Sequence, residues 1–366
     1  MPFADQLINA RAAEGLIGAV RGVVPSAALG NLAEAGGRLD GLALRERADL
    51  LRDALLADLP GDYTRFADVV RRSAPLLAGW MIWPVTSAVA AKAVADGGPE
   101  AFDDAMGLLA ELTGRLTAEF AIRTLLRHDL DRALAIVRDW TASGDPDVRR
   151  LASEGTRPYL PWSIRVPEVI SRAGVTVPIL DALYRDDSEY VRRSVGNHLN
   201  DLSRDQPGLV VETAGRWLAE ADAHTASVVR RGLRTLVKKG HPGALATLGF
   251  APATIDVEGP VLGEGTVAVG GVLSFSAVLR NTGTEAARIA VDYVVYHHRA
   301  DGSQSGKTFK LTTRTLEPGE EMRVVREHSF RPITTRRYYA GPHGVALQVN
   351  GVVSARAEFE LTGGTA

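Results

Sequence analysis

Residues 145–162, DPDVRRLASEGTRPYLPW, contain both a helix start and a helix stop. The Asp-Pro pair at the beginning is typical of a first helical turn, because aspartate accepts from free amide groups and proline fits the first position. The two prolines near the end cannot continue a helix, so the chain has to leave it near Arg157. We therefore predict a short helix from about residue 146, followed by a turn that contains Trp162.

The Val-Arg-Arg triplet within this stretch recurs along the chain. It occurs at residues 70–72, 148–150, 191–193 and 229–231. The last three copies are 43 and 38 residues apart, and each follows a helix-start signal. A period near 40 residues is typical of HEAT-like helical pairs, which stack and bury a continuous core. We predict a right-handed α-solenoid in which the valines pack inward and the arginines pair with acids of neighbouring repeats.

Composition changes near residue 250. Before it, alanine, leucine and arginine recur at helical spacing; after it, β-branched residues alternate with polar ones between turn-forming segments. Short strands at this density predict an immunoglobulin-like β-sandwich. We expect a HEAT-like repeat domain at 1–250 and a sandwich domain at 251–366, with GFAPATIDVEG (249–259) as the linker.

The bulk composition describes an ordinary globular protein. The 366 residues are 45% hydrophobic and 23% charged, the formal net charge is −2, and cysteine is absent. Disulfides, thiolate catalysis, zinc ribbons and iron–sulfur clusters are therefore excluded. The N-terminus does not resemble a signal peptide, and the longest apolar run, 74–85, is shorter than the roughly 20 residues that span a membrane. We expect a cytoplasmic, soluble protein.

Acidic residues recur at matching places in the predicted repeats. Glu154 and Asn197 each lie six residues after the valine of their triplet. Stacked repeats would therefore place Glu154 beside a polar helix stripe that contains Asn197, Asn200 and Asp201. Glu119, one helical pair earlier, is a third acid on the same side. Such carboxylates could form a reactive centre on the concave face, and the same spacing also suits salt bridges between repeats.

Cations and one aromatic residue accompany these acids. Trp162 is expected near the Glu154 end of its helix, where its ring could pack in the core or face a cation. One group of basic side chains is a candidate to contact DNA phosphates. The alternative is that these side chains form an ordinary solvated surface. This group consists of Arg193, Arg230, Arg231, Arg234, Lys238 and Lys239.

Other chemistries have little support in the sequence. H-E-x-x-H, Walker and G-x-S-x-G motifs are absent. His297 and His298 lie on a predicted strand, so their rings point to opposite faces and one is expected in the core. We predict no metal site.

Four runs resemble the AlkC family of DNA alkylation-repair glycosylases, which are relatives of the AlkD HEAT-repeat enzymes. They are TAEFAIR (117–123), RRLASEGTRPYLPW (149–162), SEYVRRSVGNHLNDLSRDQP (188–207) and LRTLVKKGHPGALATLG (233–249). The resemblance is strong over about residues 100 to 250 and weak before them. The C-terminal region is similar to the immunoglobulin-like domain of one AlkC subgroup, in which this domain helps to wrap DNA.

The resemblance implies an activity and a set of residues. The family excises N3-methylated bases such as 3-methyladenine and 3-methylcytosine, without metal or cofactor. Its catalytic acids match Glu119, Glu154 and Asp201, and its active-site aromatic residue matches Trp162. Arg157, Asn197 and Asn200 are further candidates to contact the base. The chain departs from the expected pattern at Arg231-Gly232, where a His-Ala pair is expected.

The resemblance therefore favours a monofunctional DNA glycosylase acting as a monomer on double-stranded DNA that contains alkylated bases. Carboxylates would stabilise an oxocarbenium-like sugar and activate water, leaving an abasic site. The alternative is a non-catalytic HEAT-repeat scaffold whose polar stripe binds a protein or nucleic acid.

Overall fold

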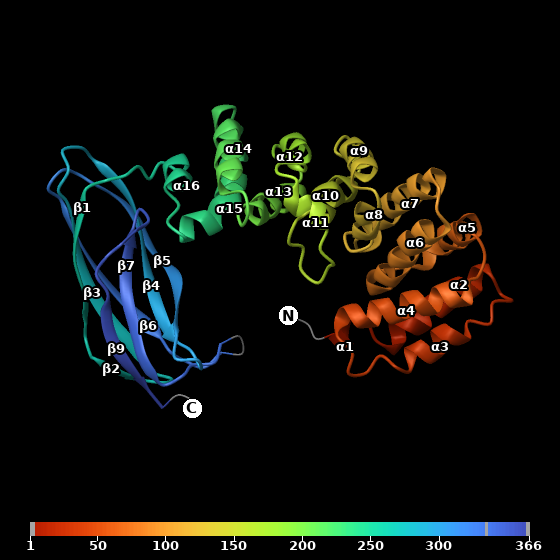
Figure 1. The fold of residues 1–366 in the computed structure, drawn as a ribbon, viewed down its shortest axis with the longest axis horizontal. Helices are drawn as coiled ribbons and strands as arrows, with labels where there is room; N and C mark the ends of the chain where they lie inside the picture. The colour runs from red at the N-terminus through yellow and green to blue at the C-terminus, as the bar shows by residue number, and fades with distance from the viewer. Residues whose placement is uncertain (1–3, 334–335, 364–366) are drawn as a thin grey trace. The chain divides into compact units, whose positions relative to one another are not determined.

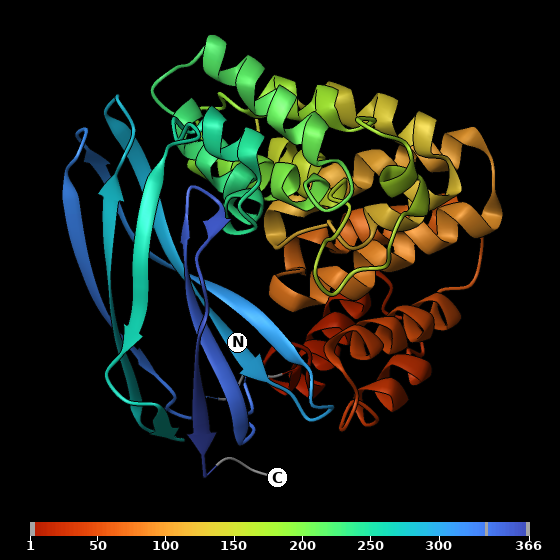
Figure 2. The ribbon, with the colours of Figure 1, turned by 60° about the vertical axis from the view of Figure 1, so that its left-hand side comes forward.

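The computed structural model describes residues 4–333 and 336–363 and divides into two compact units. The first unit is helical and comprises Met1–Val210 and Arg216–Gly232. The second comprises Val211–Gly215 and Leu233–Ala366 and contains every strand of the described chain. In Figures 1 and 2 the helices run from red to green and the strands are green-blue to violet.

Most helices of the first unit follow one another as short antiparallel elements (Figure 1). Among the residues that the structure describes, no helix is both long and apolar enough to cross a membrane. The α-helices are α1 (Ala4–Leu7), α2 (Ala10–Val23), α3 (Gly30–Gly36), α4 (Leu44–Asp58), α5 (Tyr63–Ser73), α6 (Ile82–Asp96), α7 (Pro99–Leu112), α8 (Ile122–His128), α9 (Leu130–Trp140), α10 (Pro146–Gly155), α11 (Pro167–Ser171), α12 (Val177–Leu183), α13 (Glu189–Leu202), α14 (Pro207–Ala219), α15 (Thr225–Lys238) and α16 (Pro242–Thr247). Three 3₁₀ helices are η1 (Ala74–Leu76), η2 (Gly79–Met81) and η3 (Thr113–Arg115).

The last three repeat triplets lie near the starts of their helices, as the sequence predicts, whereas the copy at 70–72 lies at the end of α5. α10, α13 and α15 start at residues 146, 189 and 225, and the Asp145 side chain caps α10 by accepting from Asp147 N at 2.8 Å. Val148, Val191 and Val229 are all buried in the helical core. The valine of each triplet therefore supplies the inward contact that lets one helix stack on the next.

The first arginine of two triplets has a structural role. Arg149 donates Nε and Nη2 to the carboxylate of Asp186 at 2.6 and 3.0 Å, which joins α10 to the turn before α13. Arg192 donates to the main-chain carbonyl oxygens of Asp186 and Asp187 in the same turn. The predicted pairing with an acid of the neighbouring repeat is therefore present for Arg149, whereas Arg192 bonds to the main chain of the turn before its own helix.

Two sheets form the sandwich of the second unit (Figure 2). One has the strand order β1-β3-β6, and the other has the order β2-β9-β7-β4-β5, with β8 paired to β7. The strands are β1 (Ile255–Leu262), β2 (Thr266–Ala268), β3 (Val272–Asn281), β4 (Ala287–His298), β5 (Gln304–Leu316), β6 (Glu321–Ser329), β7 (Gly341–Val349), β8 (Val352–Val353) and β9 (Ala357–Thr362).

Alternating side chains of the two sheets make one apolar core. It includes Phe275, Val291, Tyr293 and Leu347, all of which are buried. His297 faces this core and His298 is only partly buried, as the strand alternation predicts. The segments after residue 250 in which β-branched residues alternate with polar ones form β3, β4, β5, β6, β7 and β9.

The predicted linker 249–259 is wrong in its second half. Residues 255–258 belong to β1, where Ile255 and Val257 pack against the sandwich core and pair with β3. Their alternation with Asp256 and Glu258 is a strand pattern that the preceding Ala-Pro-Ala-Thr run conceals. Seven residues, 248–254, therefore separate the last helix from the first strand.

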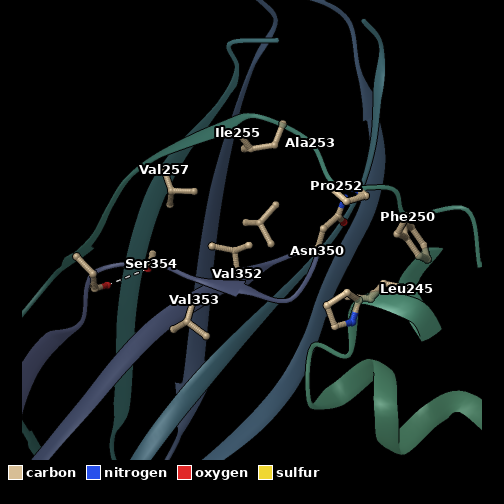
Figure 3. Close-up of a pocket in the computed structure, with 13 residues that line it drawn as sticks. Leu245, Phe250, Pro252, Ala253, Ile255, Val257, Asn350, Val352, Val353 and Ser354 are labelled. Carbon is tan, nitrogen blue, oxygen red and sulfur yellow. Dashed lines mark hydrogen bonds between the residues drawn. The ribbon is translucent and has the colours of Figure 1, made fainter. Parts of the chain in front are cut away.

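Asn350 fixes this short connection to the sandwich. Its Nδ2 donates to the carbonyl oxygens of Ala251 and Arg288 at 2.9 and 3.1 Å, and its Oδ1 accepts from Ala290 N at 2.7 Å. Beside it lies an apolar cavity of about 470 Å³, shown in Figure 3. Leu245, Phe250, Pro252, Ile255, Val352 and Val353 are among its lining residues.

Candidate active site

An ion-pair network of five side chains lies inside the helical unit. It consists of Glu119, Arg150, Glu154, Arg157 and Asp201. Arg150 pairs with Glu119 and lies 3.6 Å from Glu154 Oε1, and Arg157 Nη1 donates to that same oxygen at 2.6 Å. Arg157 also donates Nε and Nη2 to Asp201 Oδ2 and Oδ1 at 2.9 and 3.2 Å. The structure thus brings all three predicted acids together, with Arg150 between Glu119 and Glu154 and Arg157 between Glu154 and Asp201.

The acids of the network come from three successive segments. Glu119 lies between η3 and α8, Glu154 is on α10, and Asp201 is near the end of α13. Their residues are 8%, 7% and 5% exposed, respectively. The sequence predicted acids lining an open face, whereas the structure buries them, because each carboxylate has a guanidinium partner that reduces the cost of desolvation.

The two glutamates respond differently to this environment. Burial raises the pKa of Glu119, and the nearby carboxylate of Glu154 adds to that rise, although Arg150 and Thr117 oppose it. Burial also acts to raise the pKa of Glu154, but the two guanidinium groups and the Ser194 hydroxyl outweigh it, so this pKa lies below its usual value. Glu154 is therefore ionised at neutral pH, and Glu119 is the stronger proton acceptor of the two.

Hydroxyl groups donate to two of the three acids of the network. Ser194 Oγ donates to Glu154 Oε2 at 2.7 Å, and Thr117 Oγ1 donates to Glu119 Oε2 at 2.9 Å. The Tyr190 ring lies 5.1 Å from the Arg150 guanidinium carbon. These contacts fix Glu154 and the Glu119–Arg150 pair in single positions before any substrate binds.

A buried histidine, His198, contacts the main chain of α10 next to Glu154. His198 Nδ1 lies 2.8 Å from the carbonyl oxygen of Ser153, which can only accept, so Nδ1 carries the proton. Its Nε2 then accepts from Thr176 Oγ1 at 3.0 Å. Complete burial lowers the pKa of His198 to about 4, so the ring is neutral at physiological pH and serves as a structural support.

Arg123 determines the path of the chain after α10. This fully buried side chain donates to the carbonyl oxygens of Gly155, Arg157 and Ile164 at 3.1, 2.7 and 2.5 Å. A cation at the carbonyl end of a helix is favourable, which offsets part of its desolvation. Burial, together with the nearby guanidinium groups, lowers its pKa to about 10. The turn that contains Trp162 is held by these three bonds.

Trp162 lies on the surface of this turn. Its φ of 61° is a left-handed conformation that a tryptophan adopts only when its surroundings impose it, and the residue is 43% exposed. The ring centroid lies 6.4 Å from that of Trp80, which packs on Trp83, and Trp83 stacks on Phe120 at 3.9 Å. This row of rings extends from Trp162 to Phe120, which follows Glu119 in the sequence.

The other predicted side chains divide into two groups. Asn200 is buried and Asn197 is half-buried on the same helix as Asp201. The predicted phosphate contacts, which are Arg193, Arg230, Arg231, Arg234, Lys238 and Lys239, are exposed on α13, on α15 and directly after α15. They lie outside the ion-pair network.

The sequence analysis did not assign Arg150, Ser194 or Arg123 to the site. Arg150 is the third residue of its triplet, and the signal available was its spacing of four residues from Glu154. Ser194 occupies the equivalent turn of α13, and nothing in its local sequence marks it. No group of three or more His, Asp or Glu side chains in residues 4–333 and 336–363 is placed to hold a metal ion.

Comparisons with known proteins agree with this architecture. The family described as "Uncharacterised protein YhaZ, C-terminal Ig-like domain" matches residues 256–363. Uncharacterized protein YhaZ of Bacillus subtilis (strain 168) is 32% identical over 323 residues, which cover 87% of this chain and 88% of that protein. The immunoglobulin-like character of the sandwich is thereby confirmed.

A solved structure extends the similarity over both units. Pseudomonas fluorescens alkylpurine DNA glycosylase AlkC, bound to DNA containing an abasic site analogue, is 34% identical with a TM-score of 0.87. The match covers 99% of this chain and 100% of that chain. The chain is therefore a member of the AlkC family of DNA glycosylases, in the subgroup with a C-terminal immunoglobulin-like domain.

Proposed function

We propose that this chain is a monofunctional glycosylase that removes cationic N3-methylated bases, such as 3-methyladenine and 3-methylcytosine, from double-stranded DNA. The observation that supports this most strongly is the meeting of Glu119, Glu154 and Asp201 in one network. The AlkC glycosylase of Pseudomonas fluorescens, with which the chain aligns over nearly its whole length, was solved on DNA that contains an abasic site analogue.

A cationic base needs little help to leave. When the N-glycosidic bond breaks, its electron pair passes to the base, which becomes neutral and requires no general acid. The positive charge that remains develops on the sugar, which gains oxocarbenium character. Fixed carboxylates stabilise that charge better than water does, because they need no reorganisation during the reaction.

The three acids divide the remaining work. Glu154 and Asp201 stabilise the sugar cation and orient the attacking water. Glu119, whose pKa is raised by burial, contacts the base or accepts the proton that the water loses as its oxygen bonds to the sugar carbon. The products are the free base and an abasic site. Since the network contains carboxylates and guanidinium groups but no amine, hydrolysis is favoured over a Schiff-base lyase reaction.

Carboxylates repel phosphate, so the DNA needs cationic contacts away from the network. The exposed side chains of Arg193 and of the group at 230–239 supply positive charge for the backbone. Trp162, exposed at the turn after α10, offers a ring to a base. A non-catalytic scaffold would use the same surfaces but would have no need for three acids in one place.

Incubation with methylated duplex DNA tests the proposal. We expect time-dependent release of 3-methyladenine, identified by mass spectrometry, together with alkali-labile abasic sites in equal amount. Release of 3-methylcytosine from the same DNA would establish the wider substrate range. Tight DNA binding without release of any base would contradict the proposal and favour the scaffold.

A further inference from the structure

Arg157 contacts two of the three acids of the network at once. Its Nη1 donates to Glu154, and its Nε and Nη2 form a two-point contact with Asp201. The residue is only 8% exposed. In this arrangement the two carboxylates already have a cationic partner, and a second cation cannot reach the same oxygens from the Arg157 side without displacing the guanidinium.

The two arginines of the network are held in different ways. Arg150 lies within α10 and is fixed by Glu119, by Thr117 Oγ1 at 3.0 Å and by the ring of Tyr190. Arg157 lies beyond the end of α10, in the turn whose main chain is bound by Arg123, and its side chain donates to the two acids. Arg157 is therefore the member that can move while the acids stay in place on their helices.

We propose that Arg157 is a resident counter-ion that a cationic sugar or base replaces at Glu154 and Asp201, and that this competition limits how strongly the site prefers positively charged lesions. The inference rests on the proposed function of the same site. It assigns to Arg157 a role in substrate selection by charge, in addition to contact with the base.

Charge counting explains the selectivity. The network contains three carboxylates and two guanidinium groups, so its formal charge is −1, and it becomes −2 when Arg157 withdraws. Leaving two buried carboxylates without a partner is costly. A cationic lesion restores the lost charge, whereas a neutral base cannot, so only the cationic lesion drives the exchange.

Two abasic-site analogues of nearly equal shape separate this role from simple positioning. One duplex contains a pyrrolidine, which is protonated at neutral pH, and the other contains a neutral tetrahydrofuran. The measured quantity is the ratio of Kd for the neutral duplex to Kd for the cationic duplex, at pH 7.5, in the full-length protein. We expect Arg157→Gln to raise this ratio about 10-fold, because a partner that competes for the two acids has been removed.

The controls define the outcome. Arg157→Lys keeps the charge and is expected to leave the ratio near that of the wild type, as is Arg149→Gln, which breaks the comparable pair with Asp186 outside the network. An unchanged or lower ratio in Arg157→Gln, with the neutral duplex still bound, would overturn the proposal.

A second measurement needs no variant and applies even if Arg157→Gln does not fold. In a crystal structure of the wild-type protein on the pyrrolidine duplex, we expect the Arg157 guanidinium to have left Asp201 and the ammonium to have taken its place. Arg157 still bonded to both oxygens of Asp201 would overturn the proposal. Failure of the proposed function is distinguishable, because it would appear as a wild-type protein that releases no base from methylated DNA.

Discussion

Arg123 Nη1 donates to the main-chain carbonyl oxygen of Arg157 at 2.7 Å. One buried arginine thus fixes the backbone of another whose side chain joins Glu154 to Asp201. Because Arg123 lies four residues after Glu119, the same side chain connects the first acid of the network to the turn after α10. The geometry of the site therefore depends on a residue whose hydrogen bonds go to main-chain oxygens of the following turn.

Replacement of Arg123 tests this dependence. Arg123→Met leaves three buried carbonyl oxygens without a donor, and we expect a loss of about 3 kcal/mol or more in the free energy of unfolding. Urea denaturation measures this loss, and limited proteolysis should cut first within 156–166. Arg123→Lys should lose less, because it keeps the charge. A wild-type urea midpoint in Arg123→Met would show that the turn is held by other contacts.

Ser194 gives a prediction for the pH dependence of base release. Its hydroxyl donates to Glu154 and helps to keep the pKa of that carboxyl below its usual value. Removal of this bond in Ser194→Ala raises the pKa, so the acid limb of the single-turnover rate profile should move to higher pH. Ser203→Ala is the control, since Ser203 Oγ donates to a main-chain oxygen and not to the network. Superimposable acid limbs in Ser194→Ala and the wild type would exclude a role for ionised Glu154.

The sequence predicted that the acids come together, but it did not predict that they are buried. The repeat spacing places Glu154 and Asp201 together because stacked helices keep their register, and this is a local property. Their burial depends on Arg157 crossing from one repeat to the next, and such pairing is fixed only when both helices are packed. The contacts of Arg123 reach over a sequence separation of 32 to 41 residues, so no local pattern could reveal them.

A buried group of histidines makes the sandwich sensitive to acid. Burial, with the charge of Arg336 adding to it, lowers the pKa of His297 to about 3 and that of His328 to about 4. Below about pH 6.5 the unfolded chain therefore binds more protons than the folded chain does. The free energy of unfolding falls as the pH decreases from this value. The slope is about 1.4 kcal/mol per pH unit for each histidine that titrates.

The variant His328→Phe isolates this effect. Urea midpoints measured between pH 7.5 and pH 4.5 should fall less steeply in His328→Phe than in the wild type, because one of the titrating rings has been removed. Other carboxylates and histidines titrate equally in both proteins and cancel in the comparison. Parallel profiles would show that His328 does not gain a proton on unfolding.

Gly232 is required by packing rather than by backbone conformation. A Cβ added there would lie 2.5 Å from Leu199 Cδ2, so α15 contacts α13 too closely for alanine. Gly232→Ala should lower the free energy of unfolding by about 1–3 kcal/mol despite the better helix propensity. Gly215→Ala on α14, where an added Cβ meets nothing within 4 Å, should raise it by up to about 1 kcal/mol. A stabilised Gly232→Ala would mean that Leu199 can move aside.

The packing of α13 against α15 explains why the chain has Arg231-Gly232 where a His-Ala pair was expected. A His-Ala pair was expected there, and the contact with Leu199 shows why alanine would not fit this helix crossing without a shift. Arg231 itself packs its side chain over Gly196, which keeps the two helices in register. The departure is therefore compensated by the packing of α13 against α15.

Single-turnover release of 3-methyladenine from methylated duplex DNA tests whether Glu154 and Asp201 stabilise the sugar cation. Glu154→Gln and Asp201→Asn should each lower the rate constant about 100-fold or more, while DNA binding and folding persist. Asp186→Asn, which removes a buried carboxylate paired with Arg149 outside the network, should retain the wild-type rate. Wild-type rates in both Glu154→Gln and Asp201→Asn would contradict the mechanism.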